Sequence, residues 1–91
     1  MKILLHPKAN LAFADTVRYY LTKSSEIAEI FIDEFEQSLG EIEKFPEAWP
    51  AVEKNIRKHR VKNFPYAIYY TFDGEEFLVY AVCHLMRKEV P

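Results

Sequence analysis

Cysteine is nearly absent from this sequence of 91 residues, in which Cys83 is the only one. A lone cysteine cannot form a disulfide within the chain, and it excludes a zinc site built from several thiolates. The three histidines, His6, His59 and His84, lack the close spacing of metal ligands, so we expect neither a metal nor another cofactor. This cysteine usage fits a reducing compartment, and we predict a cytoplasmic location.

Long apolar runs are absent as well. No stretch reaches the roughly 18 residues that a membrane-spanning helix requires. The apolar run at residues 1–5 meets His6 and Pro7 and is too short for the core of a signal peptide. We therefore expect a soluble protein that is neither anchored in a membrane nor exported.

A large net charge is missing too, since the formal value is −2, which by itself argues against binding of nucleic acid. The charges are nevertheless segregated along the chain. Residues 26–47 contain eight acidic side chains and one lysine, whereas residues 53–62 contain five basic side chains and one glutamate. We expect an acidic surface and a separate basic strip.

What the chain does have is apolar bulk: 49% of its residues are hydrophobic, with seven Phe, six Tyr and one Trp. This content is enough for a hydrophobic core without disulfides or metal. The length leaves room for one core, so we predict a single domain over residues 1–91.

The sequence begins with a predicted strand and a helix. Residues 2–6 have the apolar run of a buried strand, and Pro7 favours a helix from residue 7 to about residue 23. Residues at helical spacing predict the buried face of this helix, with Phe13 and Tyr20 flanking it: Leu11, Ala14, Val17 or Arg18, and Leu21.

A second helix is predicted directly after the first. Ser24 and Ser25 offer hydroxyl N-caps, and Pro46 ends the helical pattern. The apolar stripe between them is the clearest periodic signal in the sequence: Ile27, Ala28, Phe31, Phe35, Leu39, Ile42 and Phe45. A connection of about three residues makes the two helices antiparallel neighbours.

The second half of the chain has the period of strands. After a turn at residues 46–50, with Trp49 packed beneath it, candidate strands cover residues 56–63, 66–72 and 77–83, the last of them fully apolar and hence central. Asp73 and Gly74 predict a type I′ hairpin turn. The expected fold is α+β, ordered β-α-α-β-β-β, with a helical hairpin packed on one face of a mostly antiparallel four-stranded sheet.

This order, with an acidic helical hairpin before a basic strand, resembles the RelE/ParE superfamily of toxins. The run Asn-Phe-Pro-Tyr-Ala-Ile-Tyr-Tyr at residues 63–70 is similar to the block before the third strand of that family. Residues 81–87 read Ala-Val-Cys-His-Leu-Met-Arg and are similar to the Ala-Val-x-His-x-x-Arg ending of ParE-like plasmid stabilisation proteins. The resemblance extends over essentially the whole chain.

The resemblance implies a growth-inhibiting toxin of a type II toxin–antitoxin system, held in a hetero-oligomer by its cognate antitoxin. RelE-like members cut messenger RNA on the ribosome, whereas ParE-like members poison DNA gyrase. RelE-like nucleases carry two arginines and often a tyrosine at positions where this sequence has Ala67, Leu85 and Pro91. Cleavage of RNA without metal requires an acid, a base and cations, so these replacements count against an RNA-cleaving toxin. We expect a ParE-like toxin that poisons DNA gyrase.

Two alternatives remain open at this point. One is a ribosome-dependent mRNA endoribonuclease, in which His84 and Arg87 would be catalytic together with the basic strip. The other is a decayed homologue that binds an antitoxin without being toxic. Without the resemblance, His84 is best interpreted as a surface or hydrogen-bonded histidine.

Four basic residues are candidates for contact with a target or with phosphate: Arg57, Lys58, Arg60 and Lys62. The alternation of a strand predicts that Lys58, Arg60 and Lys62 share one face, while Arg57 points away with His59. The simpler interpretation is a charged edge strand that blocks aggregation and offers a docking surface for an acidic antitoxin segment.

The aromatic side chains of the strands are interpreted as core rather than as platforms for nucleic-acid bases. They are Tyr66, Tyr69, Tyr70 and Tyr80. Cys83 is interpreted in the same way, as a packed thiol rather than a nucleophile.

Overall fold

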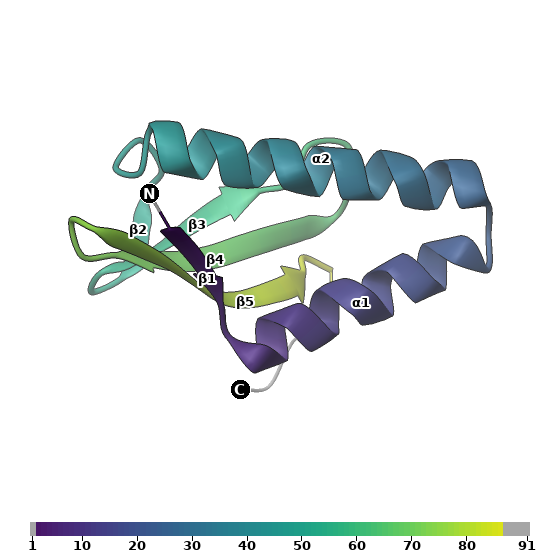
Figure 1. The fold of residues 1–91 in the computed structure, drawn as a ribbon, viewed down its shortest axis with the longest axis horizontal. Coiled ribbons are helices and arrows are strands. Elements are labelled where there is room, and N and C mark those ends of the chain that lie inside the picture. Colours follow the sequence, from purple (N-terminus) through teal and green to yellow (C-terminus); the bar gives the residue numbers. More distant parts are fainter. Residues whose placement is uncertain (1, 87–91) are drawn as a thin grey trace.

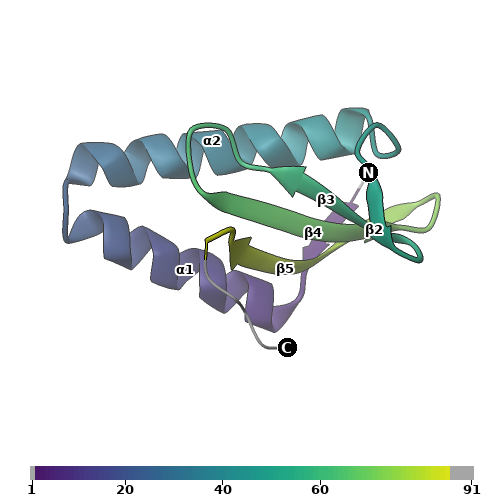
Figure 2. The ribbon, with the colours of Figure 1, turned by 180° about the vertical axis from the view of Figure 1, so that it is seen from behind.

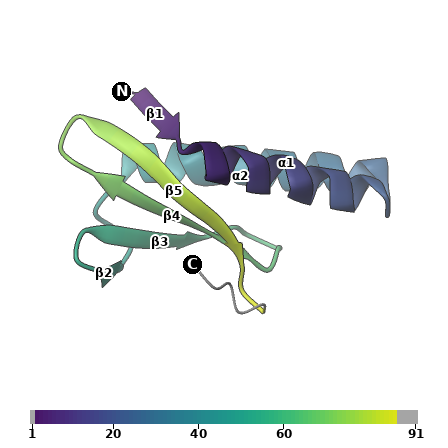
Figure 3. The same ribbon diagram turned by 90° about the horizontal axis from the view of Figure 1, so that it is seen from below.

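The computed structural model describes residues 2–86 as two layers, a helical hairpin and a five-stranded sheet (Figure 1). The elements in chain order are β1 (Lys2–Leu5), α1 (Pro7–Leu21), α2 (Ser25–Lys44), β2 (Ala51–Glu53), β3 (Ile56–Arg60), β4 (Tyr66–Phe72) and β5 (Glu76–His84). The strands lie side by side in the order β1-β5-β4-β3-β2. Both helices lie on the same side of the sheet, which leaves its other face without a helical cover in the described part of the chain (Figure 3).

The α+β class and the element order are confirmed, but the expected count of four strands is wrong. The additional strand, β2, pairs antiparallel with the start of β3. It has only three residues between Pro50 and a turn in which Lys54 has a φ of 46°. A segment this short cannot display a period of two, so no pattern of residues indicates it.

Helix α1 starts as expected and buries a different face from the expected one. Pro7 occupies the first turn, and His6 Nδ1 accepts a hydrogen bond from the Lys8 amide. The expected buried stripe is wrong at both ends, because Leu11 is 62% exposed and Leu21 is 53% exposed. The face that packs on the core is instead formed by Ala9, Ala12, Phe13, Thr16, Val17 and Tyr20. The predicted face and the observed face both have helical spacing. The observed face contains the aromatic side chains of Phe13 and Tyr20, and this larger apolar surface is the one that packs on the core.

Helix α2 follows its predicted stripe through its middle. Ser24 caps it by accepting hydrogen bonds from the Glu26 and Ile27 amides. The buried apolar residues of the helix are Ala28, Phe31, Phe35 and Ile42. The stripe fails at its ends, where Ile27 is 39% and Phe45 is 57% exposed. The tip of the hairpin, which contains Ile27, extends beyond the sheet (Figure 2), so no strand is there to cover it.

The core is centred on the ring of Phe31, which is fully buried. Ring centroids lie 5.9 Å away at Phe13 and 5.5 Å away at Tyr20, both on α1. On the sheet side they lie 5.1 Å away at Phe64 and 5.7 Å away at Tyr66. This aromatic cluster therefore joins both helices to the start of β4, at distances typical of attractive ring pairs.

Strand β4 has its predicted bounds, and β5 exceeds its predicted bounds by one residue at each end. Strand β5 lies between β1, to which it is parallel, and β4, so its interior position is confirmed. Tyr66 and Tyr70 are buried as expected, whereas Tyr69 is only half-buried and Tyr80 is 52% exposed. The register shifts at Tyr69 and Tyr70, where a bulge in the pairing with β5 leaves Tyr80 unpaired with β4.

The hairpin between β4 and β5 is present, but its expected type I′ turn is wrong. Such a turn needs a positive φ at both central residues, and only Gly74, with a φ of 100°, has one. Asp73 instead accepts hydrogen bonds from the Glu76 and Glu75 amides, at 2.9 and 3.0 Å. These two amides hold the pKa of the Asp73 carboxyl below its usual range. The loop is one residue longer than a type I′ turn allows.

Replacement of Phe31 by alanine tests the aromatic cluster. We expect the Phe31→Ala variant to lose about 3–5 kcal/mol of unfolding free energy in urea, because the rings around it would line a cavity. Phe45→Ala is the matched control, since that ring is 57% exposed, and it should cost less than about 1 kcal/mol. Equal losses in the two variants would show that Phe31 is not the centre of the core.

Candidate functional site

Strand β3 presents its residues alternately to the two faces of the sheet. His59 is 4% exposed beneath the helices, and Val61, just after the strand, is fully buried. Lys58 is half-buried and Arg60 is exposed on the opposite face. The predicted alternation is confirmed for residues 57–60. The expected strand over residues 56–63 is too long, because β3 ends at Arg60, so Lys62 does not share a strand face with Lys58 and Arg60.

Arg57 is held on the helix side of the sheet by the turn that precedes β2. Its guanidinium donates to the carbonyl of Trp49 at 2.6 Å and to that of Glu47 at 3.3 Å. Beside it, the Tyr70 hydroxyl donates to the carbonyl of Pro46 at 2.6 Å. Arg57 and Tyr70 thus clamp the turn to the sheet, and Arg57 is separated from the other three candidate cations.

His59 belongs to the same assembly, and its role was not evident from the sequence. Its Nε2 lies 2.9 Å from Glu41 Oε1, and its ring centroid lies 4.3 Å from that of Trp49. Its Nδ1 is buried without a hydrogen-bond partner among the described residues. The sequence signal for this role is the position of His59 two residues before the apolar Val61, because residues two apart on a strand lie on the same face.

The open face of the sheet is built around Lys58 and Arg60. The register places Arg60 beside Ala67 and Ala67 beside Cys83, so these three residues share that face. Lys62 is exposed but follows the end of β3. In the part of the chain that the structure describes, none of Lys58, Arg60 and Lys62 takes part in an ion pair. We call this surface the open face and define it by Lys58, Arg60, Ala67, Tyr69, Ala81 and Cys83.

Burial on the open face is uneven. Ala67 is fully buried, while Tyr69 and Cys83 are half-buried. Burial, with a smaller contribution from Cys83, raises the pKa of the Tyr69 phenol. The interpretation of Cys83 as a packed thiol is consistent with this position.

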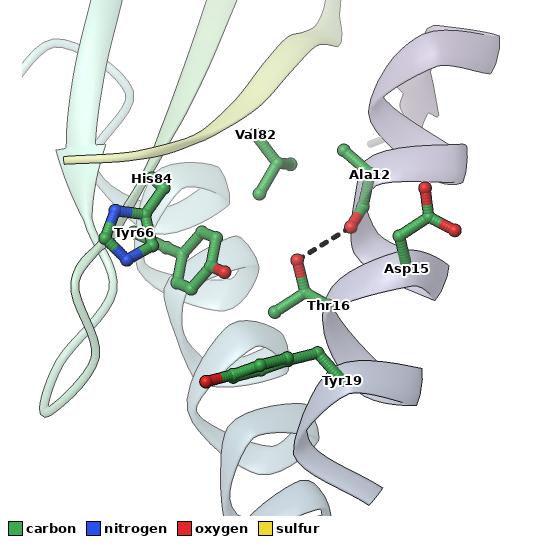
Figure 4. A pocket seen from close by; sticks show the side chains of 7 residues that line it. All are labelled: Ala12, Asp15, Thr16, Tyr19, Tyr66, Val82 and His84. Carbon is green, nitrogen blue, oxygen red and sulfur yellow. Dashed lines mark hydrogen bonds between the residues drawn. The ribbon is translucent and has the colours of Figure 1, made fainter. Parts of the chain in front are cut away.

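His84 lies on the other side of the sheet. It is paired with Tyr66, its Nδ1 accepts a hydrogen bond from the Met86 amide at 3.0 Å, and its ring centroid lies 4.9 Å from that of Tyr66. The side chain lines a pocket of about 350 Å³ between the sheet and α1 (Figure 4). The other residues around this pocket are Ala12, Asp15, Thr16, Tyr19, Tyr66 and Val82.

The sheet therefore separates the predicted acid or base from the predicted cations. His84 faces α1, whereas Lys58 and Arg60 face the opposite side, and Arg57 is bonded to the turn before β2. Arg87 lies outside the described residues. Between residues 2 and 86, the structure does not bring the candidate residues together as an acid–base site surrounded by cations, which metal-independent RNA cleavage requires.

No three His, Cys, Asp or Glu side chains among the described residues lie close enough to hold a metal ion. No helix within residues 2–86 is long and apolar enough to cross a membrane.

Comparison with known proteins gives a family and a fold. The model of the family "ParE toxin of type II toxin-antitoxin system, parDE" matches residues 3–88. A solved structure described as "Chromosomal ParDE TA system from P. aeruginosa" is similar with a TM-score of 0.72 and 12% sequence identity, over 93% of this chain and 96% of that chain. At this identity the structure supports the fold alone. No curated protein matches the chain.

Removal of the Arg57 guanidinium tests the clamp. We expect Arg57→Met to lose about 1.5–3 kcal/mol of unfolding free energy, because the carbonyls of Trp49 and Glu47 lose a charged donor. Lys58→Met, one residue away on the opposite face, should change the free energy of unfolding by less than about 0.5 kcal/mol. The comparison is made by urea denaturation followed through Trp49 fluorescence, and equal effects would contradict the clamp.

The Tyr70 hydroxyl makes a pH-dependent contribution. Burial raises the pKa of this phenol above its ordinary value of about 10, against a smaller lowering by Arg57. The folded state therefore favours the neutral hydroxyl, and its contribution is complete below about pH 10 and is lost as the pH rises further.

Tyr70→Phe should accordingly cost about 0.5–1.5 kcal/mol at pH 8, and the difference from the unsubstituted chain should narrow as the pH rises above about 10. The measurement is unfolding free energy in urea at each pH. Tyr80→Phe removes a hydroxyl from an exposed side chain and is the control. A Tyr70→Phe difference that stays constant as the pH rises would contradict the assignment.

Proposed function

This chain belongs to the family of ParE toxins of type II toxin–antitoxin systems, and from that premise we propose that it arrests bacterial growth by poisoning DNA gyrase, without catalysing a reaction. The observation that carries the proposal is the family match, which extends over residues 3–88 and so includes the described elements from β1 to β5 except for Lys2, the first residue of β1. A cognate antitoxin neutralises the toxin, and both act in the cytoplasm.

The separation of the candidate residues supports inhibition rather than RNA cleavage. An acid or base acts on a reacting atom within hydrogen-bond distance, and cations stabilise charge at the same atom. His84 and the pair Lys58 and Arg60 lie on opposite faces of the sheet, so one phosphate group cannot contact both sets. Ala67 and Leu85, which stand where RelE-like nucleases carry arginine, support the same conclusion.

The open face is the surface that we assign to the target. Lys58 and Arg60 provide positive charge there, and neither pairs with an acidic group of the described chain. The acidic side chains of α2 lie on the opposite side of the sheet. A surface with this segregation favours an acidic partner segment and repels a basic one.

The same surface suits the antitoxin. The similar structure is described as a ParDE toxin–antitoxin system, and by that likeness we expect a bound antitoxin here as well. An antitoxin segment with acidic side chains would pair with Lys58 and Arg60 and cover the half-buried Tyr69. Neutralisation then follows from competition, since one face cannot hold the antitoxin and gyrase together.

Controlled expression in bacteria tests the function. We expect the chain alone to arrest growth with loss of plasmid supercoiling, and co-expression of the adjacent small open reading frame to restore growth. Cut messages with intact supercoiling would identify the RNA-cleaving alternative. Unimpaired growth with a folded protein would identify a homologue that binds without toxicity.

A charge reversal on the open face locates the contact surface. In a supercoiling assay with purified gyrase, Lys58→Glu with Arg60→Glu should raise the half-inhibitory concentration by roughly tenfold or more, equivalent to about 1.4 kcal/mol of binding. Lys8→Glu with Lys23→Glu makes the same change in charge at two exposed positions, one in the first turn of α1 and one just after the helix, and should leave inhibition unchanged. An equal loss of inhibition in both variants would show that net charge, and not the open face, causes the effect.

A further inference from the structure

The outward side of α1 carries a second stripe of residues at helical spacing, opposite to the face that packs on the core. Leu11 is 62% exposed, Leu21 is 53% exposed, and Ala14 between them is half-buried. With Arg18 they form the spacing of three, four and three residues that places side chains along one seam of a helix. Helix α1 therefore has apolar residues on two opposite faces, and the described chain buries only one of these faces.

No element of the described chain covers this seam. Helix α1 packs against α2 and β5 through Ala9, Phe13 and Tyr20, which lie on its other side. Single exposed leucines are common on protein surfaces and need no explanation. Two leucines at the ends of a heptad-spaced seam, about 15 Å apart along the helix, are a surface that fits another helix.

The charges at the middle of the seam decide which helix fits. Arg18 and Asp15 form an ion pair one turn apart, and their side chains are 67% and 69% exposed. One acidic and one basic group stand near the midpoint between the two leucines. If a second α1 helix is related to the first by a two-fold axis through this midpoint, Leu11 of one helix lies beside Leu21 of the other. The same rotation brings Asp15 of each helix near Arg18 of the other.

We propose that α1 is a self-association surface, on which two copies of this chain pair their α1 helices antiparallel about a two-fold axis level with Thr16. In this arrangement each Leu11 packs beside the partner's Leu21, and each Arg18 lies over the partner's Ala14. The small side chain of Ala14 leaves room for the guanidinium, which reaches the partner's Asp15. The contact is isologous, as the interfaces of symmetric dimers are.

A second copy is favoured as the occupant by this self-complementarity. Each Asp15 and Arg18 pair meets its own copy in the reverse direction, so two acids and two bases form one cluster at the axis. A contact between two single helices buries an area at the low end of the range for stable interfaces. The dimer is therefore weak, and its population depends on protein concentration. The surface is also distinct from the open face, on the far side of the sheet.

Sedimentation velocity of the purified chain tests the proposal. We expect the unsubstituted protein to change from monomer to dimer as its concentration rises, and Leu11→Lys with Leu21→Lys to stay monomeric over the same range. Val52→Lys is the matched control, because Val52 is 51% exposed on β2, and it should dimerise as the unsubstituted chain does. Circular dichroism verifies that each variant is folded.

Reversal of charge then tests the symmetry. Asp15→Arg places four cations at the axis and should raise the dimer Kd by roughly tenfold or more, whereas Asp15→Arg combined with Arg18→Asp restores the alternation and should return the Kd to near its original value. A chain that is monomeric at every concentration overturns the proposal. A dimer that none of these substitutions weakens overturns it as well, since another surface would then hold the copies together.

Discussion

The packing of aromatic rings around Phe31 is the constraint on which the rest of the molecule depends. Its neighbours come from α1 and from the start of β4, with Phe35 on the same helix, so a single ring joins the two consecutive helices to a strand that is distant in sequence. This contact forces both helices onto one face of the sheet, since the inward sides of α1 and α2 share one cluster. The opposite face has no helical cover in the described part of the chain, and the division of the protein into a packed side and an open side follows from it.

This division also explains why residues of similar chemistry have different roles. Arg57 and Lys58 are adjacent, yet Arg57 donates to the carbonyls of a turn while Lys58 stands on the open face. His59 and Arg60 differ in the same way, one paired with Glu41 and packed on Trp49, the other exposed. A basic strip in the sequence is thus two groups in space, a structural group that holds the sheet to its flanking turn and a surface group that is available to a partner.

Local patterns were enough to predict the order of the elements, the bounds of β4 and the alternation of β3, because each depends on residues within one element. The buried face of α1 could not be predicted in this way, since Leu11 and Phe13 both belong to stripes of helical spacing and only the position of Phe31 selects between them. The separation of His84 from Lys58 depended on the pairing of β5 with β4, which no single segment specifies. The turn at Asp73 depended on a side-chain hydrogen bond that substitutes for the expected backbone geometry.

The alternation of β3 has a consequence for how this protein can change over evolutionary time. Substitutions at Arg57 and His59 disturb the attachment of a turn and the packing of Trp49, so the fold constrains these two positions whatever the target. Lys58 and Arg60 take part in no ion pair of the described chain, so the fold constrains them less. If the open face holds the target and the antitoxin, as we propose, substitutions at every second codon of this strand can change recognition while the fold is kept.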